Sequence, residues 1–361
     1  MASISNMHLL VDISAHGLGH LAQTAPVLEA LCVLRPDVRL TVRSAIPRER
    51  LARRIDGEFA YVGEAHDFGF VMHNAVDIDF AASGARYRAF HTDWKAKVAL
   101  EADWLRAHRV DALLANVAYL PLAGAAVAGI PAAAMCSLNW ADLFRHYFGD
   151  EAWAKDIHAQ ALAAYNTATF LRVTPSMPMT DFARRHKVGP IARYGRKDRA
   201  GIGSRLGIDA SSRRVLVAMG GMEFRLPVEN WPRAPDVVWL VPESWQTQRE
   251  DVRAFDTVGI DFTDLLANVD AVITKSGYGT FAEAACNGVA VLYLERDDWP
   301  EEAPLATWLA GCARARTVTR AQLMAGDVLD ALATLWRQPI PTVPPATGAA
   351  AAAEWLAQHL L

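Results

Sequence analysis

The feature that most constrains the fold is a pattern that occurs once in each half of the chain. A short apolar run leads into a glycine-rich turn, and a helical repeat follows. Residues 8–13 lead into the turn at 14–20, after which Leu21, Ala25 and Leu28 recur at helical spacing. Residues 271–274 lead in the same way into the turn at 275–283. Because a strand, a glycine turn and a helix form the repeating unit of parallel sheets, both halves are predicted to be alternating α/β.

The length of the chain favours two domains. At 361 residues it exceeds the size at which a single core usually stops growing, although one large barrel is the main rival. The alternating pattern fades between about residues 174 and 207, which indicates an interdomain connection. Further strands are expected at residues 39–43, 214–219, 237–241 and 288–294, and a strand–helix–strand unit at 111–138.

These observations predict an N-terminal Rossmann-like domain at residues 1–190 and a second one at 191–345. Residues 339–345 are rich in proline and precede an alanine-rich segment. We expect residues 346–361 to form a helix that packs back on the first domain, although a simple capping helix is the alternative. The predicted fold class is α/β with two doubly wound domains that face a central cleft.

Composition and charge exclude several classes of protein. Hydrophobic residues make up 52% and charged residues 21% of the chain, as in a globular protein with a large core. The formal net charge of -4 gives no attraction to nucleic acid or to anionic membranes. The four cysteines are too scattered for a disulfide framework or a zinc site: Cys32, Cys136, Cys286 and Cys312.

The sequence predicts a cytoplasmic protein without an integral membrane span. Residues 1–14 lack the basic start of a secretory signal and contain Asp12. The most apolar stretch, residues 111–138, is divided by Asn116, Pro121 and Pro131 into pieces too short to cross a bilayer. The sequence does not predict the oligomeric state.

The turn at residues 275–283 has the parts of an anion site. Ser276, Gly277, Tyr278 and Gly279 lie between a buried strand and the start of a helix, whose free N–H groups attract phosphate. Thr280 adds a hydroxyl donor, and Glu283 is placed to accept the hydroxyls of a ribose. Neither a Walker loop nor a complete dinucleotide-binding motif is present, so a tight turn without a ligand is the alternative to a nucleotide site.

Two other segments are expected at the same edge of the second sheet. Gly220 and Gly221 end its first strand and give a second glycine turn for a diphosphate, or simply a turn that needs positive φ. The loop at residues 295–302 contains Asp298, Glu301 and Glu302, whose carboxylates suit sugar hydroxyls. Trp299 in the same loop offers an apolar face to a sugar ring, and a solvated acidic loop is the alternative.

In the first half, His16 and His20 flank the glycine turn that follows the first strand. A histidine can accept a proton from a hydroxyl near neutral pH, so one of them is a candidate general base, with Asp12 as an orienting partner. The alternative for His20 is a helix cap. The glycine turn separates the two histidines, so a shared metal ion is not expected, and there is no Gly-x-Ser-x-Gly nucleophile motif.

With these motifs in place, the chain resembles GT-B glycosyltransferases of the UDP-glycosyltransferase and peptidoglycan N-acetylglucosaminyl transferase group. It is most similar to the glycosyltransferase-like N-terminal region of L-arabinokinases. The resemblance runs over most of the chain and includes these segments: residues 16–20, 129–131, 137–140, 220–221, 277–284 and 296–302. It implies Phe262 beside the base, Gly220, Gly221 and Thr280 on the diphosphate, Glu283 on the ribose, and Glu301 or Glu302 on the donor sugar.

The chain also departs from this family. Asn116 stands where relatives often have an aspartate, Met222 and Glu223 follow the glycine pair, and Glu301-Glu302 replaces a pair that contains glutamine. The donor sugar therefore cannot be inferred from relatives. No galactokinase-like domain follows residue 361 in this sequence, so kinase activity is not expected.

The resemblance implies an enzyme that moves a sugar from a UDP- or dTDP-type donor to a hydroxyl acceptor. The expected reaction is inverting and independent of metal ions, with no cofactor besides the nucleotide sugar. Two alternatives remain open on the same fold: a nucleotide-sugar hydrolase or epimerase, and a non-catalytic nucleotide-sugar-binding protein.

Overall fold

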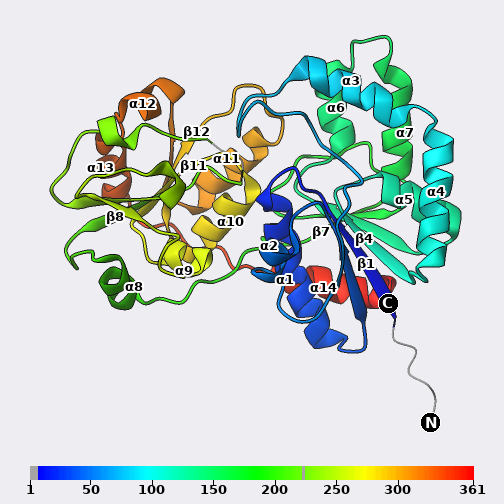
Figure 1. The fold of residues 1–361 in the computed structure, drawn as a ribbon, viewed down its shortest axis with the longest axis horizontal. Coiled ribbons are helices and arrows are strands. Elements are labelled where there is room, and N and C mark those ends of the chain that lie inside the picture. Colours follow the sequence, from blue (N-terminus) through cyan, green and yellow to red (C-terminus); the bar gives the residue numbers. More distant parts are fainter. Residues whose placement is uncertain (1–6, 222–223) are drawn as a thin grey trace. The chain divides into compact units, whose positions relative to one another are not determined.

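The computed structural model describes residues 7–221 and 224–361 (Figure 1). Its chain divides into two compact units. Unit 1 comprises Met1–His73, Asp77–Ile191 and Thr347–Leu361, and unit 2 comprises Asn74–Val76 and Ala192–Ala346. Met222 and Glu223, which the sequence comparison singled out, lie outside the described residues.

Unit 1 is built on a parallel seven-stranded sheet. Its strands are β1 (His8–Ile13), β2 (Arg39–Arg43), β3 (Ala60–Val62), β4 (Ala112–Asn116), β5 (Ala132–Cys136), β6 (Thr169–Arg172) and β7 (Arg185–Lys187). The order is β3-β2-β1-β4-β5-β6-β7, so the direction of winding reverses between β1 and β4. Every residue of β1 and β4 is buried, as expected of central strands that are covered on both faces.

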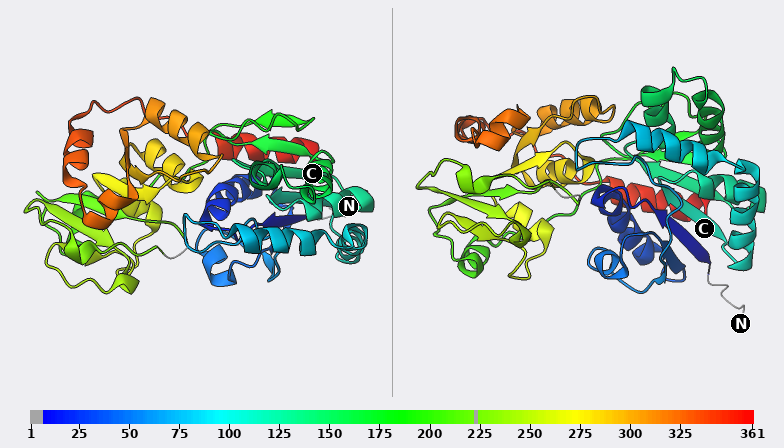
Figure 2. Two further views of the ribbon diagram at one scale, coloured as in Figure 1. Left: turned by 90° about the horizontal axis from the view of Figure 1, so that it is seen from above. Right: turned by 45° about the horizontal axis from the view of Figure 1, so that its top comes forward.

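Helices cover both faces of this sheet (Figures 1 and 2). They are α1 (Leu18–Leu34), α2 (Arg48–Ala52), α3 (Phe80–His91), α4 (Trp94–Ala107), α5 (Leu120–Ala128), α6 (Trp140–Phe148), α7 (Ala154–Tyr165) and α14 (Gly348–His359). Helix α14 packs against α1, although the two are more than 300 residues apart in the sequence, and α4 packs against α5. The C-terminal segment therefore belongs to unit 1.

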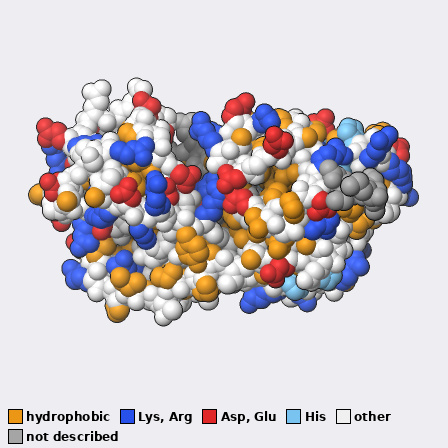
Figure 3. All heavy atoms as spheres, turned by 90° about the horizontal axis from the view of Figure 1, so that it is seen from below, with side chains coloured by type: hydrophobic (Ala, Val, Ile, Leu, Met, Phe, Trp, Pro, Cys, Tyr) orange, Lys and Arg blue, Asp and Glu red, His pale blue; other side chains and the backbone are white. Residues whose placement is uncertain are grey.

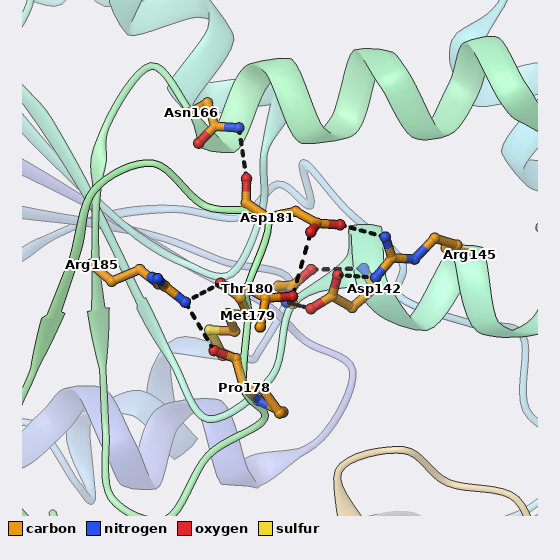
Figure 4. A network of polar contacts seen from close by, with 9 residues as sticks. Asp142, Arg145, Asn166, Pro178, Met179, Thr180, Asp181 and Arg185 are labelled. Carbon is orange, nitrogen blue, oxygen red and sulfur yellow. Dashed lines mark hydrogen bonds and ion pairs between the residues drawn. The ribbon is translucent and has the colours of Figure 1, made fainter.

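A polar network holds the segment that joins β6 to β7 (Figure 4). Arg145 of α6 contacts both Asp142 and Asp181. Asn166 donates to the backbone oxygen of Asp181, at 3.3 Å, and Arg185 donates to that of Met179, at 3.1 Å. These contacts fix an irregular segment to the helices beside it.

Unit 2 has a parallel six-stranded sheet in the order β10-β9-β8-β11-β12-β13. The strands are β8 (Arg213–Val217), β9 (Val237–Val241), β10 (Val252–Ala254), β11 (Ala271–Lys275), β12 (Ala290–Leu294) and β13 (Ala315–Val318). The helices are α8 (Arg199–Leu206), α9 (Phe262–Ala267), α10 (Tyr278–Asn287), α11 (Glu302–Cys312), α12 (Arg320–Ala325) and α13 (Leu329–Arg337). Here the winding reverses between β8 and β11.

Both sheets are therefore doubly wound and parallel, as the sequence predicts. Ligands of such sheets bind beyond the carboxyl ends of the strands where the winding reverses. In unit 1 that point lies at the ends of β1 and β4, and in unit 2 at the ends of β8 and β11. On the face shown in Figure 3, basic and acidic side chains are interspersed, without a field of one sign.

Candidate functional site

His20 lies in the first turn of α1, at the reversal point of unit 1, and is only 6% exposed. Its Nδ1 is 2.9 Å from Oδ1 of Asn116, the last residue of β4. The amide of Asn116 also donates to Thr24 Oγ1, at 2.9 Å, and Thr24 donates to the backbone oxygen of His20. This network makes Asn116 Oδ1 the acceptor, so Nδ1 of His20 carries the hydrogen and Nε2 keeps its lone pair.

Burial decides the protonation state of His20. Loss of hydration lowers the pKa of its imidazole to about 4, and the hydrogen bond to Asn116 opposes that change only in part. An aspartate at position 116 would favour the protonated ring more strongly than the neutral amide does. His20 is therefore a neutral proton acceptor throughout the physiological pH range.

Asp12 does not orient this histidine, which corrects the prediction from the sequence. The register of the sheet places Asp12 of β1 opposite Arg43 of β2, and Arg43 Nε donates to Asp12 Oδ2 at 2.6 Å. Glu101 of α4 accepts from the same guanidinium at 2.6 Å, and all three side chains are buried. A buried guanidinium needs such partners, and Arg43 is a closer partner of Asp12 than the ring of His66, whose Nδ1 lies 3.7 Å from the same oxygen.

His16 lies in the turn between β1 and α1 and is half-buried, in contrast to His20. Both imidazole rings contact the indole of Trp140, the first residue of α6. The ring centroids are 5.1 Å apart for His16 and 5.8 Å apart for His20. The reversal point of unit 1 thus brings the two predicted histidines to one aromatic side chain.

Asp67 was not found from the sequence, yet it belongs to this cluster. Its Oδ2 accepts from Nε1 of Trp140 at 2.6 Å, and Ser14 donates to it as well. Burial raises the pKa of its carboxyl to about 7, the charge of Asp12 adds to that rise, and the two hydrogen bonds oppose it. Asp67 lies in the long loop between β3 and α3, where no sequence pattern indicates which side chains turn inward.

In unit 2, the side chain of Lys275 lies between two glycine turns. A Cβ atom placed on Gly220 would lie 3.3 Å from Cε of Lys275, and one placed on Gly277 would lie 3.8 Å from its Nζ. Gly220 has φ of +95° and follows β8, whereas Gly277 follows the adjacent strand β11. The two predicted turns therefore lie beside each other, with a cation between them.

The charge of Lys275 depends on its surroundings. Desolvation and the nearby Arg296 lower the pKa of the ammonium to about 7, against the opposing effect of Glu301 and Glu302. An added anion would favour the protonated form. This makes the site responsive to a phosphate ligand.

The turn from Ser276 to Glu283 has the predicted geometry of a helix start. Gly277 is the N-cap of α10, and no side-chain hydrogen bond caps this helix start. The first N–H groups of a helix have no partner within the helix, which suits such a start to an anion. Tyr278 is 3% exposed and anchors this start in the core, while Gly279 and Thr280 are half-buried. Glu283 is buried at 3% exposure, and Phe262 is the half-buried first residue of α9.

The acidic loop after β12 is held by its own carboxylates. Glu302 accepts hydrogen bonds from Ser276 Oγ and from the backbone N–H of Arg296, the latter at 2.8 Å, and burial raises the pKa of its carboxyl. Glu301 accepts from the indole N–H of Trp299 at 3.1 Å. These bonds join the loop to the glycine turn.

Two side chains of this loop differ in their exposure. Asp298 is exposed and has φ of +55°. Trp299 is 7% exposed, and the guanidinium of Arg296 covers its ring at 3.7 Å. The expectation that Trp299 offers an open face to a sugar is therefore wrong for this structure.

Residues 7–221 and 224–361 contain no group of three or more His, Cys, Asp or Glu side chains that could hold a metal ion. Within the same residues, no helix is both long and apolar enough to cross a membrane.

No protein-family model matches the chain. An L-arabinokinase of Arabidopsis thaliana is 24% identical to it over 307 residues. That match covers 83% of this chain but only 29% of the arabinokinase, so the chain spans less than a third of that relative.

Solved glycosyltransferases have the same fold over almost the whole chain. The kitacinnamycin glycosyltransferase superimposes with a TM-score of 0.61 at 16% identity, covering 99% of this chain and 100% of that one. The calicheamicin glycosyltransferase CalG4 gives 0.58 at 15% identity, covering 99% and 94%. The spinosyn rhamnosyltransferase SpnG complexed with thymidine diphosphate gives 0.56 at 18%, covering 98% and 96%. The chain therefore has the GT-B fold, as predicted.

Proposed function

We propose that the protein transfers a sugar from a nucleoside-diphosphate sugar of the UDP or dTDP type to a hydroxyl acceptor. The observation that carries this proposal is the position of Lys275 between the turns of Gly220 and Gly277, at the reversal point of unit 2. Two glycine turns, one cation and a helix start are suited to two linked phosphates. The GT-B fold supports the same reading.

In this proposal unit 2 holds the donor. Gly220, Gly221, Ser276, Gly277, Gly279 and Thr280 lie along the diphosphate. Phe262 lies beside the base, and Glu283 accepts from the ribose. Asp298 and Glu301 face the donor sugar, with Tyr278 anchoring the turn. Because Glu302 already accepts two internal hydrogen bonds, we propose that it shapes the sugar site and leaves direct contact to Glu301.

Unit 1 then supplies the acceptor side. The acceptor hydroxyl gives its proton to a histidine, and its oxygen bonds to the anomeric carbon while the bond from that carbon to the diphosphate breaks. The leaving oxygen takes the electron pair, and attack opposite to it inverts the anomeric configuration. The ammonium of Lys275 and the N–H groups of α10 stabilise that charge, so no metal ion is needed.

The two histidines are suited to proton transfer in different ways. His20 has a fixed tautomer with Nε2 free to accept, but it is almost fully buried. His16 is half-buried and therefore easier for a hydroxyl to reach. Both remain candidates.

Binding is tested first, with a thermal-shift and calorimetric panel of UDP, dTDP and GDP and of their sugars. A ligand that binds the native state raises its melting temperature. We expect one nucleoside diphosphate to bind, with weaker binding in Glu283→Ala. If no nucleotide binds and Glu283→Ala changes nothing, the proposal is refuted.

Turnover is tested by chromatography of the bound donor with a panel of hydroxyl acceptors, in the presence of EDTA. We expect product with inverted anomeric configuration, seen by NMR, and loss of product in His16→Ala or His20→Ala. The exposed His108 of the same unit provides the control variant His108→Ala. Free sugar released at a rate independent of acceptor would show a hydrolase instead, and saturable binding without turnover a binding protein.

A further inference from the structure

The carboxylate that the sequence placed beside the histidines is missing from its expected positions. Asp12 is paired with Arg43, and position 116 has a neutral amide. A histidine that accepts a proton becomes a cation, and a cation in a buried site needs compensation. Another group of unit 1 must therefore provide the negative charge that stabilises the imidazolium.

Asp67 is placed to do so through Trp140. The carboxylate accepts the indole N–H at 2.6 Å, a short hydrogen bond typical of an ionised acceptor. The centroids of the His16 and His20 rings lie 5.1 Å and 5.8 Å from that of the same indole, within the range at which a cation is attracted to an aromatic ring. Trp140 is 1% exposed, so water does not screen these contacts strongly.

The loop that carries Asp67 is fitted closely to these rings. Gly69 has φ of +58°, and a Cβ atom placed on it would lie 2.7 Å from both Cγ of His16 and Cη2 of Trp140. Ser14, directly after β1, donates to Asp67. The loop, the turn after β1 and the start of α6 therefore form one packed group within unit 1.

We propose that Asp67 is a positioning residue that acts through Trp140, holding its indole against the two histidines and stabilising the imidazolium formed when the acceptor gives up its proton. This rests on the proposed function for its place in catalysis. The coupling of Asp67, Trp140 and the histidines is a property of the protein alone and is tested without substrate.

Other ionisable groups face Asp67 and enter the design of the test. Asp12 of β1 raises the pKa of its carboxyl and Arg86 of α3 lowers it. Three buried phenols also feel its charge: Tyr87, Tyr119 and Tyr165. The pKa values of these phenols are raised well above 10, so all three stay neutral between pH 5 and 8, where the carboxyl of Asp67 titrates.

The test is an NMR titration of the full chain from pH 4 to 8.5. The indole N–H resonance of Trp140, assigned with Trp140→Phe, is expected to shift with a midpoint near pH 7 as Asp67 loses its proton. Asp67→Asn keeps an oxygen for the indole but has no charge, so this shift should disappear. An indole resonance that does not move anywhere between pH 4 and 8.5 in the unaltered protein would overturn the proposal, even if the variant fails to fold.

The second readout is the pKa of each histidine, from its ring C–H resonances. Asp67→Asn is expected to lower the pKa of His16, His20 or both by roughly 0.5 to 1 unit, a three- to tenfold loss of proton affinity. Glu64→Gln removes an exposed carboxylate from the same loop and should leave both unchanged. Histidine pKa values that are equal in Asp67→Asn and the unaltered protein would refute the coupling, whether or not sugar transfer is observed.

Discussion

Asn116→Asp is the substitution that most directly tests the environment of His20. It changes one side-chain nitrogen to oxygen and puts a carboxylate 2.9 Å from Nδ1. The ring already gives its Nδ1 hydrogen to this position, so the contact itself is retained. What changes is the charge beside a histidine that is 6% exposed.

The magnitude follows from the two effects that set this pKa. Burial lowers it to about 4, and the neutral amide does little to restore it. An opposite charge within hydrogen-bonding distance favours the charged form by about 1 to 3 pKa units. The pKa of His20 in Asn116→Asp is therefore expected at about 5 to 7, which corresponds to a coupling of about 1.4 to 4 kcal/mol.

The assay is a titration of the His20 ring C–H resonance, assigned with His20→Gln. Asn116→Ala serves as the matched control, since it removes the acceptor without adding charge and should leave the pKa at about 4 or below. A rise of less than about 0.5 unit in Asn116→Asp, far below the usual effect of a close ion pair, would show that Nδ1 does not face this side chain.

The same shift has a consequence for stability. His20 has a pKa of about 4 in the folded chain and about 6.5 when unfolded, so between these values only the unfolded chain binds the proton. Above pH 6.5 the ring is neutral in both states and does not oppose folding. As the pH falls from 6.5 towards 4, protonation of the unfolded chain lowers the free energy of unfolding. Between pH 7 and 5 the loss is up to about 2 kcal/mol in the unaltered protein and smaller in Asn116→Asp. Urea unfolding at both pH values measures the difference.

Two further predictions concern the cations Lys275 and Arg43. Lys275→Met keeps most of the length of the side chain but not its ammonium group, and should weaken nucleoside-diphosphate binding about tenfold at pH 6, as the loss of a charged hydrogen bond does. The affinity of the unaltered protein should fall as the pH rises through 7, where Lys275 loses its proton, and calorimetry showing an equal pH dependence in Lys275→Met would contradict this. Arg43→Met removes the guanidinium that two buried carboxylates share and should reduce the free energy of unfolding by about 3 to 5 kcal/mol, measured in urea. Arg35→Met removes a partly exposed pair with Asp37 and should cost at most about 1 kcal/mol, so similar losses would count against the argument.

The sequence was sufficient for features that depend on local pattern. The glycine turns at Gly220 and Gly277 follow apolar runs, and parallel winding makes the ends of β8, β11 and β12 neighbours. The same reasoning placed His16 and His20 at the end of β1. Short-range patterns and one topological rule therefore predict which segments meet.

Side-chain partners were harder to predict because they depend on register and on loop paths. Asp12 faces Arg43 because β1 and β2 pair in one particular register, and a shift of one residue would separate them. Asp67 reaches Trp140 along a loop with no repeating pattern, from 73 residues away in the sequence. Trp299 was expected to be open, but the guanidinium of Arg296, three residues earlier in the same loop, covers it.

These environments also separate the roles of the two histidines. A base whose pKa is about 4 has some 2.5 units less proton affinity than free imidazole, which costs about 3 kcal/mol of driving force if His20 itself takes the proton. Asn116→Asp would restore part of that affinity.

If His20 is the base, the Asn116→Asp variant should turn over faster at pH 8, and the acid limb of its kcat/KM profile should move up from near pH 4. If His16 is the base, with its ring on the indole that Asp67 holds, the limb should stay in place in Asn116→Asp and move down in Asp67→Asn. The two profiles together assign the proton to one ring.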